Sequence, residues 1–179
     1  MQLEDIFGYK NQLMKEILTN KTIVHLINEE VPLEQADKLA YTQVFPAEFI
    51  PETLHDGSTI IMFDVDLQYV PNKTFLIPVL RVWVLAHRSR LRLPDGGGVR
   101  TDRICSEICK VINGSRYYGL GELNLSGMQR SAPVTDYNGK CMTFTMKEFN
   151  RQHNPKQAIP SNRKEDVPVI TDYTSAESG

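Results

Sequence analysis

The sequence has no long apolar run and no marked excess of charge of either sign. Its most apolar stretch, Phe75–Ala86, is interrupted by Pro78 and Arg81 and falls short of the roughly 18 residues that a membrane-spanning helix needs. The formal net charge is −2, so bulk charge does not direct the chain to nucleic acid. Residues 1–10 carry acids and lack the basic and apolar segments of a secretory signal. We therefore expect a soluble, intracellular protein with no membrane partner.

Cysteine is scarce, and the three that occur are an odd number: Cys105, Cys109 and Cys141. In a chain without an export signal, this favours reduced thiols over disulfides. Cys105 and Cys109 lie one helical turn apart among isoleucines, where cysteine packs as a small apolar residue. A zinc site would need further Cys or His ligands at regular spacing, and none follow in the sequence. We predict that both cysteines belong to the core.

The sequence motifs that bind nucleotides are also missing. Gly96-Gly97-Gly98 precedes a predicted helix, and helix N-termini attract phosphate. A Walker loop, however, continues with Lys and then Ser or Thr, whereas Val99-Arg100-Thr101 stands here. We interpret the glycines as a flexible loop between a strand and a helix.

No recognisable catalytic constellation occurs. A nucleophilic cysteine needs a histidine beside it, and Asp64 and Asp66 have no third partner in the pattern. The histidines are scattered, and none is spaced with a cysteine in a known pattern: His25, His55, His87 and His153. We therefore expect no catalytic, cofactor-binding or metal site, and a protein that is not an enzyme.

Hydrophobic spacing predicts helices in the first third of the chain. Apolar residues recur at helical intervals from Leu3 to Leu18 and again from Thr22 to Asn28, with Asn20 as the cap between the two helices. Prolines then punctuate an irregular stretch in which residues 33–39 are predicted to form a brief helix.

From Thr59 the apolar period changes to two, which is typical of strands. Residues 59–69 alternate apolar and polar side chains, and residues 75–87 are apolar on both faces apart from Arg81. Together the two segments predict a hairpin. Pro78 cannot donate a ladder hydrogen bond, so we expect a bulge or an edge position there.

The rest of the chain predicts one more helix and further strands. Thr101 or Asp102 is the expected cap of a helix that runs to about Ile112. A strand over 119–125 follows, and Asn138-Gly139 predicts a two-residue hairpin turn before an alternating strand. This order of elements indicates an α+β fold, a mostly antiparallel sheet with helices on one face.

Composition divides the chain into a domain and a tail. Residues 1–150 are predicted to form one domain, with a helical and irregular part over 1–58 and a sheet plus helix over 59–150. From 151 to 179 large apolar residues are few. Such a segment does not bury enough apolar surface to fold alone, so we predict an extended polar C-terminal tail.

Charge is unevenly distributed along the chain. Residues 1–58 hold 4 basic and 10 acidic side chains, whereas residues 81–103 hold 6 arginines and 2 acids. The arginines after His87 alternate and would project to one side of an extended segment. The acidic and basic segments can pair within one subunit or between copies; the alternatives are contact with nucleic-acid phosphates and a solvated loop. The candidate contact residues are Arg88, Arg90, Arg92, Arg100, Arg103, Glu29, Glu30 and Glu34.

The layout of residues 59–150 resembles that of tail terminator and neck proteins of tailed bacteriophages. The shared features are a long hairpin that ends in an Arg-rich loop, a helix beginning near Arg100-Thr-Asp-Arg-Ile, and a Gly-Leu-Gly-Glu-Leu strand at Gly119. They continue with Tyr137-Asn-Gly-Lys, followed by Met-Thr-Phe-Thr-Met.

This resemblance implies a structural virion protein that performs no chemistry and uses no cofactor. Its subunits would form a homo-oligomeric ring, commonly a hexamer, at the head–tail junction or the head-proximal end of the tail. Such rings stop tube polymerisation or join the tail to the capsid. A heterologous ring contact needs two different complementary patches on each copy, and the uneven charge suits this.

The implied location is the virion, after synthesis in the host cytoplasm. The implied partners are further copies of the chain, the tail tube, and neck or connector proteins, with DNA passing through the lumen. A neck, adaptor or head-completion ring is the alternative at the same junction. A nucleic-acid-binding accessory protein that uses the Arg-rich segment 87–103 is the alternative from another class.

Overall fold

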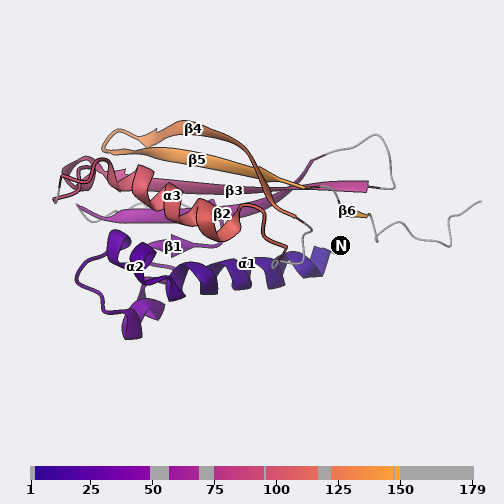
Figure 1. Ribbon diagram of the computed structural model, residues 1–179, viewed down its shortest axis with the longest axis horizontal. Coiled ribbons are helices and arrows are strands. Elements are labelled where there is room, and N and C mark those ends of the chain that lie inside the picture. The colour runs from indigo at the N-terminus through magenta and orange to yellow at the C-terminus, as the bar shows by residue number, and fades with distance from the viewer. Residues whose placement is uncertain are drawn as a thin grey trace, which may run out of the picture.

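Helical segments open the chain, as the hydrophobic spacing predicts (Figure 1). The side-chain carbonyl of Asn20 accepts hydrogen bonds from the backbone N–H groups of Thr22 and Ile23, at 3.0 and 3.2 Å. These bonds satisfy donors that the first helical turn leaves unpaired, so the predicted cap is confirmed. The segments are α1 (Leu3–Thr19), α2 (Lys21–Ile27) and the 3-10 segment η1 (Leu33–Leu39).

The computed structural model describes residues 3–48, 57–68, 75–94, 96–116, 122–146 and 148–149. The predicted tail, 151–179, lies outside these residues, and the predicted division into a domain and a tail stays a prediction. Within the described residues the fold is α+β, as expected.

The strands form one mostly antiparallel sheet, which confirms that prediction. The strand order is β1-β2-β3-β5-β4, and β6 pairs with the start of β3. Only β1 and β2 run parallel to each other among the described strands. The strands are β1 (Val44–Phe45), β2 (Thr59–Gln68), β3 (Phe75–His87), β4 (Asn124–Val134), β5 (Tyr137–Thr145) and β6 (Glu148–Phe149).

The predicted hairpin is formed by β2 and β3, whose register runs from Thr59 opposite Ala86 to Gln68 opposite Ile77. On the other side of β3, the ladder with β5 ends at Val79 and the ladder with β6 covers Phe75 and Leu76. Pro78 lies in the interval between these two ladders. The missing N–H of proline therefore falls where β3 has an edge, which is one of the two positions expected for it.

The hairpin turn predicted at Asn138-Gly139 is wrong. The turn between β4 and β5 lies at Thr135 and Asp136, and Asn138-Gly139 belongs to β5. A Cβ on Gly139 would lie 1.8 Å from the carbonyl oxygen of Val84 on β3. Glycine is needed here because two backbones approach closely, not because the chain turns. The strand predicted over 119–125 is also displaced, since β4 begins at Asn124, and 117–121 lie outside the described residues.

Helix α3 (Arg100–Ile112) begins two or three residues earlier than the predicted caps, Thr101 or Asp102, would place it. Its N-cap is Val99, which provides no side-chain hydrogen bond. The predicted caps lie inside the first turn instead: Thr101 is buried, and a carboxylate oxygen of Asp102 pairs with Lys140 Nζ of β5 at 2.9 Å. Both side chains are used for packing against the sheet, so neither serves as a cap.

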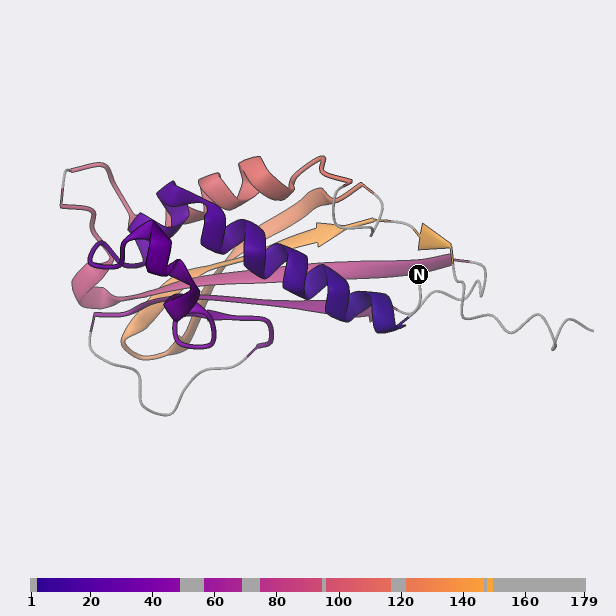
Figure 2. The same cartoon turned by 90° about the horizontal axis from the view of Figure 1, so that it is seen from below.

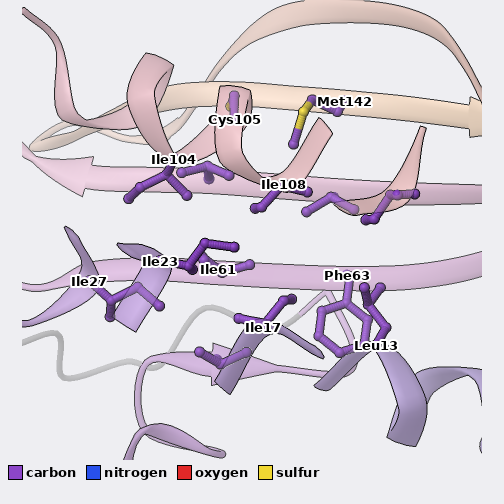
Figure 3. Packing of buried hydrophobic residues seen from close by; sticks show 14 of the residues in the cluster. Leu13, Ile17, Ile23, Ile27, Ile61, Phe63, Ile104, Cys105, Ile108 and Met142 are labelled. Carbon is purple, nitrogen blue, oxygen red and sulfur yellow. The ribbon is translucent and has the colours of Figure 1, made fainter. Parts of the chain in front are cut away.

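All three α-helices pack on one face of the sheet (Figure 2). The main hydrophobic cluster joins them to alternating residues of the sheet, as Figure 3 illustrates for Ile17 of α1, Ile27 of α2, Ile104 of α3 and Phe63 of β2. A second, smaller cluster lies on the opposite face of the sheet and contains Phe45, Ile60, Met62, Trp83, Leu85, Tyr137 and Cys141. Strand β3 contributes to both clusters, which explains why its sequence is apolar on both faces.

The cysteines of α3 pack in the core, as predicted. Cys105 is 3% exposed, and Cys109 is half-buried with its Sγ 3.7 Å from Met142 Sδ. Burial raises the pKa of Cys105 to about 12 and also raises the pKa of Cys109. A thiol reacts through its thiolate, so neither is poised as a nucleophile.

We expect Cys105 and Cys141 to resist alkylation in the folded protein. Both thiols are buried, so the reagent cannot reach them. Burial also raises the pKa of each thiol, so the reactive thiolate is scarce at pH 8. Mass spectrometry after a pulse of iodoacetamide, without and with urea, measures this site by site. Rapid labelling of Cys105 in the native protein would contradict the core assignment.

Candidate functional site

The guanidinium of Arg100 joins three segments of the chain. Nε donates to the carbonyl oxygen of Arg90 at 2.9 Å, Nη1 to that of Leu26 at 2.7 Å, and Nη2 to Glu29 Oε1 at 2.7 Å. Only 4% of the Arg100 side chain is exposed. The rigid fork of donors suits this bonding pattern, which a lysine could not reproduce. Arg100 thus fixes α2 and the turn after β3 to the start of α3.

This geometry corrects the role predicted for Arg100 and Glu29. The two side chains form an ion pair within one chain, which is one of the two pairings that the charge distribution left open. Arg100 is buried, so it is not available for a contact with another subunit. The local sequence gave no sign of this burial, because arginine is rarely buried unless it is paired and the partner lies 71 positions away.

Glu29 gives the folding stability a defined pH dependence. The hydrogen bond from Arg100 lowers the pKa of Glu29 below its ordinary value of 4.5. Because the pKa of Glu29 is lower in the folded protein than in the unfolded chain, the stabilisation is complete at pH values above the pKa of the unfolded chain. It is lost as the pH falls through the pKa of the folded protein. We expect Glu29→Gln to be less stable than the wild type at pH 7, with the difference shrinking to nothing in strong acid.

Urea unfolding of both proteins at a series of pH values measures this difference. The matched control is Glu30→Gln, which removes the adjacent exposed carboxylate, whereas the carboxylate bonded to Arg100 is that of Glu29. A Glu29→Gln deficit that is the same at every pH would show that the charge is not what stabilises the pair.

Three of the remaining predicted arginines, Arg88, Arg90 and Arg92, lie on or just after a short turn that follows β3, and Arg103 lies in α3. Arg88 and Arg90 belong to the 3-10 segment η2 (Arg88–Arg90), so the predicted extended, alternating display is wrong. The Arg88 side chain is 74% exposed and its Nε lies 3.3 Å from Asp136 Oδ1. Arg92 is exposed and Arg90 is half-buried. Arg103, 59% exposed, has its Nε 3.7 Å from Glu107 Oε1.

The glycine-rich loop after this turn is closed by backbone hydrogen bonds. Leu93 N–H donates to Gly98 at 3.0 Å, and Arg100 N–H donates to Leu91 at 2.8 Å. Gly96 and Gly98 have φ of 73° and 96°, a conformation that favours glycine. The loop therefore requires its glycines for its shape. A cavity of about 360 Å³ separates it from α2, with His25, Glu29 and Arg103 in its lining.

Strand β4 lies almost entirely beyond the strand predicted over 119–125. It forms one edge of the sheet. Its residues are exposed on both faces, except Ser131, which is half-buried. Met128 is 50% exposed, and Leu125 and Val134 are 39% and 40% exposed. A strand with no buried face has no apolar alternation, so the usual sequence signal is absent.

The basic turn and the β4 edge meet at the β4–β5 turn. Arg88 donates its backbone N–H to the carbonyl oxygen of Asp136 at 2.9 Å, and its side chain contacts the carboxylate of the same residue. Arg88 and the β4 edge are therefore parts of one continuous surface. We call this surface, consisting of Arg88 and β4, the edge surface.

A family model named YomW matches residues 11–146 of the chain. The chain belongs to the YomW family. This membership makes it a phage-associated protein. No curated protein matches the chain.

The YomW match begins in α1 and ends just after β5. It therefore includes the Arg100–Glu29 pair, the basic turn and all of β4, while residues 147–179 lie beyond it. The edge surface and the bonds that hold the turn in place thus belong to the region matched by the YomW family.

Two further observations concern other kinds of site in this YomW-family chain. Among the residues that the structure describes, no three His, Cys, Asp or Glu side chains gather as a metal ion would require. Over the same ranges, no helix has the length and apolarity needed to cross a membrane.

Proposed function

We propose that this chain is a structural, non-enzymatic protein of a phage particle. Its copies form a ring at the head–tail junction or the head-proximal end of the tail, in the manner of a tail terminator. The observation that carries this proposal is the edge surface. An exposed strand edge carries unpaired N–H and C=O groups that invite another chain, and β4 is an 11-residue edge strand in which the Leu125 N–H is already paired with Asn113 Oδ1.

The distribution of charge supports a head-to-tail contact between copies. The edge surface carries Arg88 and Arg130, and Arg92 is exposed in the loop that follows η2. Glu30 and Glu34 lie on the exposed surface around α2 and η1, where they remain available to a neighbour, unlike Glu29. Two different complementary patches on one subunit generate a closed ring when the rotation between copies closes.

The first experiment measures the mass of the purified protein by light scattering across a range of concentrations. We expect a discrete multiple of the 20.4 kDa chain. Arg88→Ser combined with Arg92→Ser should reduce this multiple, because both side chains are exposed and would pair with the acids of a neighbouring copy. Lys15→Ser, which removes an exposed positive charge on α1, is the matched control and should assemble normally.

A second experiment determines whether the protein is a component of the phage particle. Phage lacking the gene would be complemented with wild-type or variant protein, and the purified particles imaged and analysed by mass spectrometry. Overlong tails point to a tail terminator, whereas separate heads and tails point to the neck or adaptor alternative. Complete absence of the chain from infectious particles would overturn the proposal.

A nucleic-acid-binding accessory role is the second candidate, and one observation favours it. Arg88, Arg92 and Arg103 are exposed within a short segment that is closed by backbone bonds. Phosphate contacts of such arginines would make the affinity fall steeply with salt. A titration with DNA and RNA at several salt concentrations tests this role, and no binding at the lowest salt would dismiss it.

A further inference from the structure

The two edges of the sheet differ sharply among the described residues. One edge is β1, a two-residue strand, and short edge strands are a known protection against unwanted pairing. The other edge is β4, whose register against β5 shifts between Leu125 and Gly127 and again between Ser131 and Val134. These bulges and Pro133 protect its ends. Between them, Gly127–Ser131 forms a regular ladder with β5 and leaves its outer side open.

The chain itself contains a segment suited to this open edge. Residues 167–174 read Val-Pro-Val-Ile-Thr-Asp-Tyr-Thr, and β-branched and aromatic residues are enriched in strands. Asp172 is the one charged residue of this segment, since Glu165 and Asp166 before it are balanced by Arg163 and Lys164. β4 has Arg130 and no acidic residue, and Arg130 is opposite Lys140 of β5. The two sequences are therefore complementary in charge, whereas two β4 strands would place like charges together.

The length of the chain allows the segment to reach another subunit. Phe149, the last described residue, pairs with Phe75 at the start of β3. Residues 150–166 then provide 17 residues of linker, which span at most about 55–60 Å when extended. A neighbouring copy in a ring lies within that distance, since a domain of this size is roughly 40 Å across.

We propose that residues 167–174 of each copy add a strand to the β4 edge of the neighbouring copy. The added strand would satisfy the outer N–H and C=O groups of Gly127–Ser131, as strand addition does in other recognition systems. The proposal rests on the proposed function in one respect, namely that the copies are neighbours in a ring. It deepens that function by naming the contact that links them.

Cross-linking of full-length protein tests this proposal. Two variants are purified separately, Ala132→Cys on β4 and Val169→Cys in the segment, one of them carrying a mass tag. Oxidation of the mixture should give a disulfide between one copy of each. The control pair replaces Ala132→Cys by Asn11→Cys on the exposed side of α1. We expect a yield about tenfold or more above this control, because held partners meet at millimolar effective concentration.

A scan of the cysteine from Val169 to Tyr173 provides a second reading. Side chains of a strand alternate between faces, so an added strand should give yields that alternate with period two. A uniform yield along the scan, or a yield no higher than that of the control pair, would overturn the proposal. An efficient link within one chain of the Ala132→Cys, Val169→Cys double variant, with no mixed dimer, would also overturn it.

The outcome separates this proposal from the proposed function. If particles contain the chain at the head–tail junction but the mixed dimer does not form, strand addition is wrong and the ring role stands. If the mixed dimer forms but particles lack the chain, the ring role is wrong and the contact between copies stands.

Discussion

Arg100→Ala should lower the free energy of unfolding by about 3 kcal/mol, because it removes all three bonds of the buried guanidinium. The carbonyl oxygens of Leu26 and Arg90 would lose their donor, and Glu29 would lose its counter-ion. Buried acceptors without partners cost more than the lost bonds alone contribute. Urea unfolding followed by circular dichroism measures the change, with the slope of the transition checked for constancy.

The matched comparisons for Arg100→Ala separate geometry from charge. Arg100→Lys keeps the charge but not the planar fork, so we expect a smaller yet clear loss. Arg103→Ala removes a side chain that is 59% exposed and should change stability by no more than about 0.5 kcal/mol. Equal effects of Arg100→Ala and Arg103→Ala would mean that the bonds of Arg100 do not stabilise the fold.

Gly139→Ala should destabilise the protein by about 3 kcal/mol or more, since an added methyl group has no room. The Cβ would meet the carbonyl oxygen and carbon of Val84 at 1.8 and 2.8 Å, and the Cα of Leu85 at 2.9 Å. All three atoms are backbone of β3, so no side-chain rotation can relieve the overlap. The central pairing of β3 with β5 would have to separate. Thermal unfolding and the yield of soluble protein report this loss.

Gly127→Ala is the control for this substitution, because it also lies in a strand of the same hairpin. A Cβ there meets nothing within 4 Å, so the change should be neutral or slightly stabilising through the unfolded state. If Gly139→Ala and Gly127→Ala behaved alike, the close approach of β5 to Val84 would not be a constraint on folding.

The sequence predicted the parts of the fold that depend on hydrophobic periodicity. Helix α1, the Asn20 cap, the β2–β3 hairpin and the end of α3 near Ile112 follow from residues that are adjacent or one turn apart. Gly139 was misread because Asn-Gly is typical of tight turns. Its actual reason is contact with a residue of another strand, 55 positions away (139 − 84), and no local pattern encodes such a contact.

The candidate site was predicted only in part, for a similar reason. The sequence located the basic segment and the acidic segment, but it could not say that Arg100 is buried while Arg88 is exposed. That difference arises from the first turn of α3, which directs one arginine toward α2. Strand β4 was placed too early because exposure on both faces removes the alternation by which a strand is usually found.

Strand β3 has a consequence for how the molecule comes apart. Its Val82 and Val84 pack in the main cluster under the helices, while Trp83 and Leu85 pack in the cluster on the other face. Loss of either cluster would release β3, on which the other cluster also depends. The two clusters should therefore unfold in a single cooperative transition. Strand β4 stands outside this unit, because none of its described residues belongs to either cluster. It can fray and re-form at low energetic cost while the rest of the sheet persists.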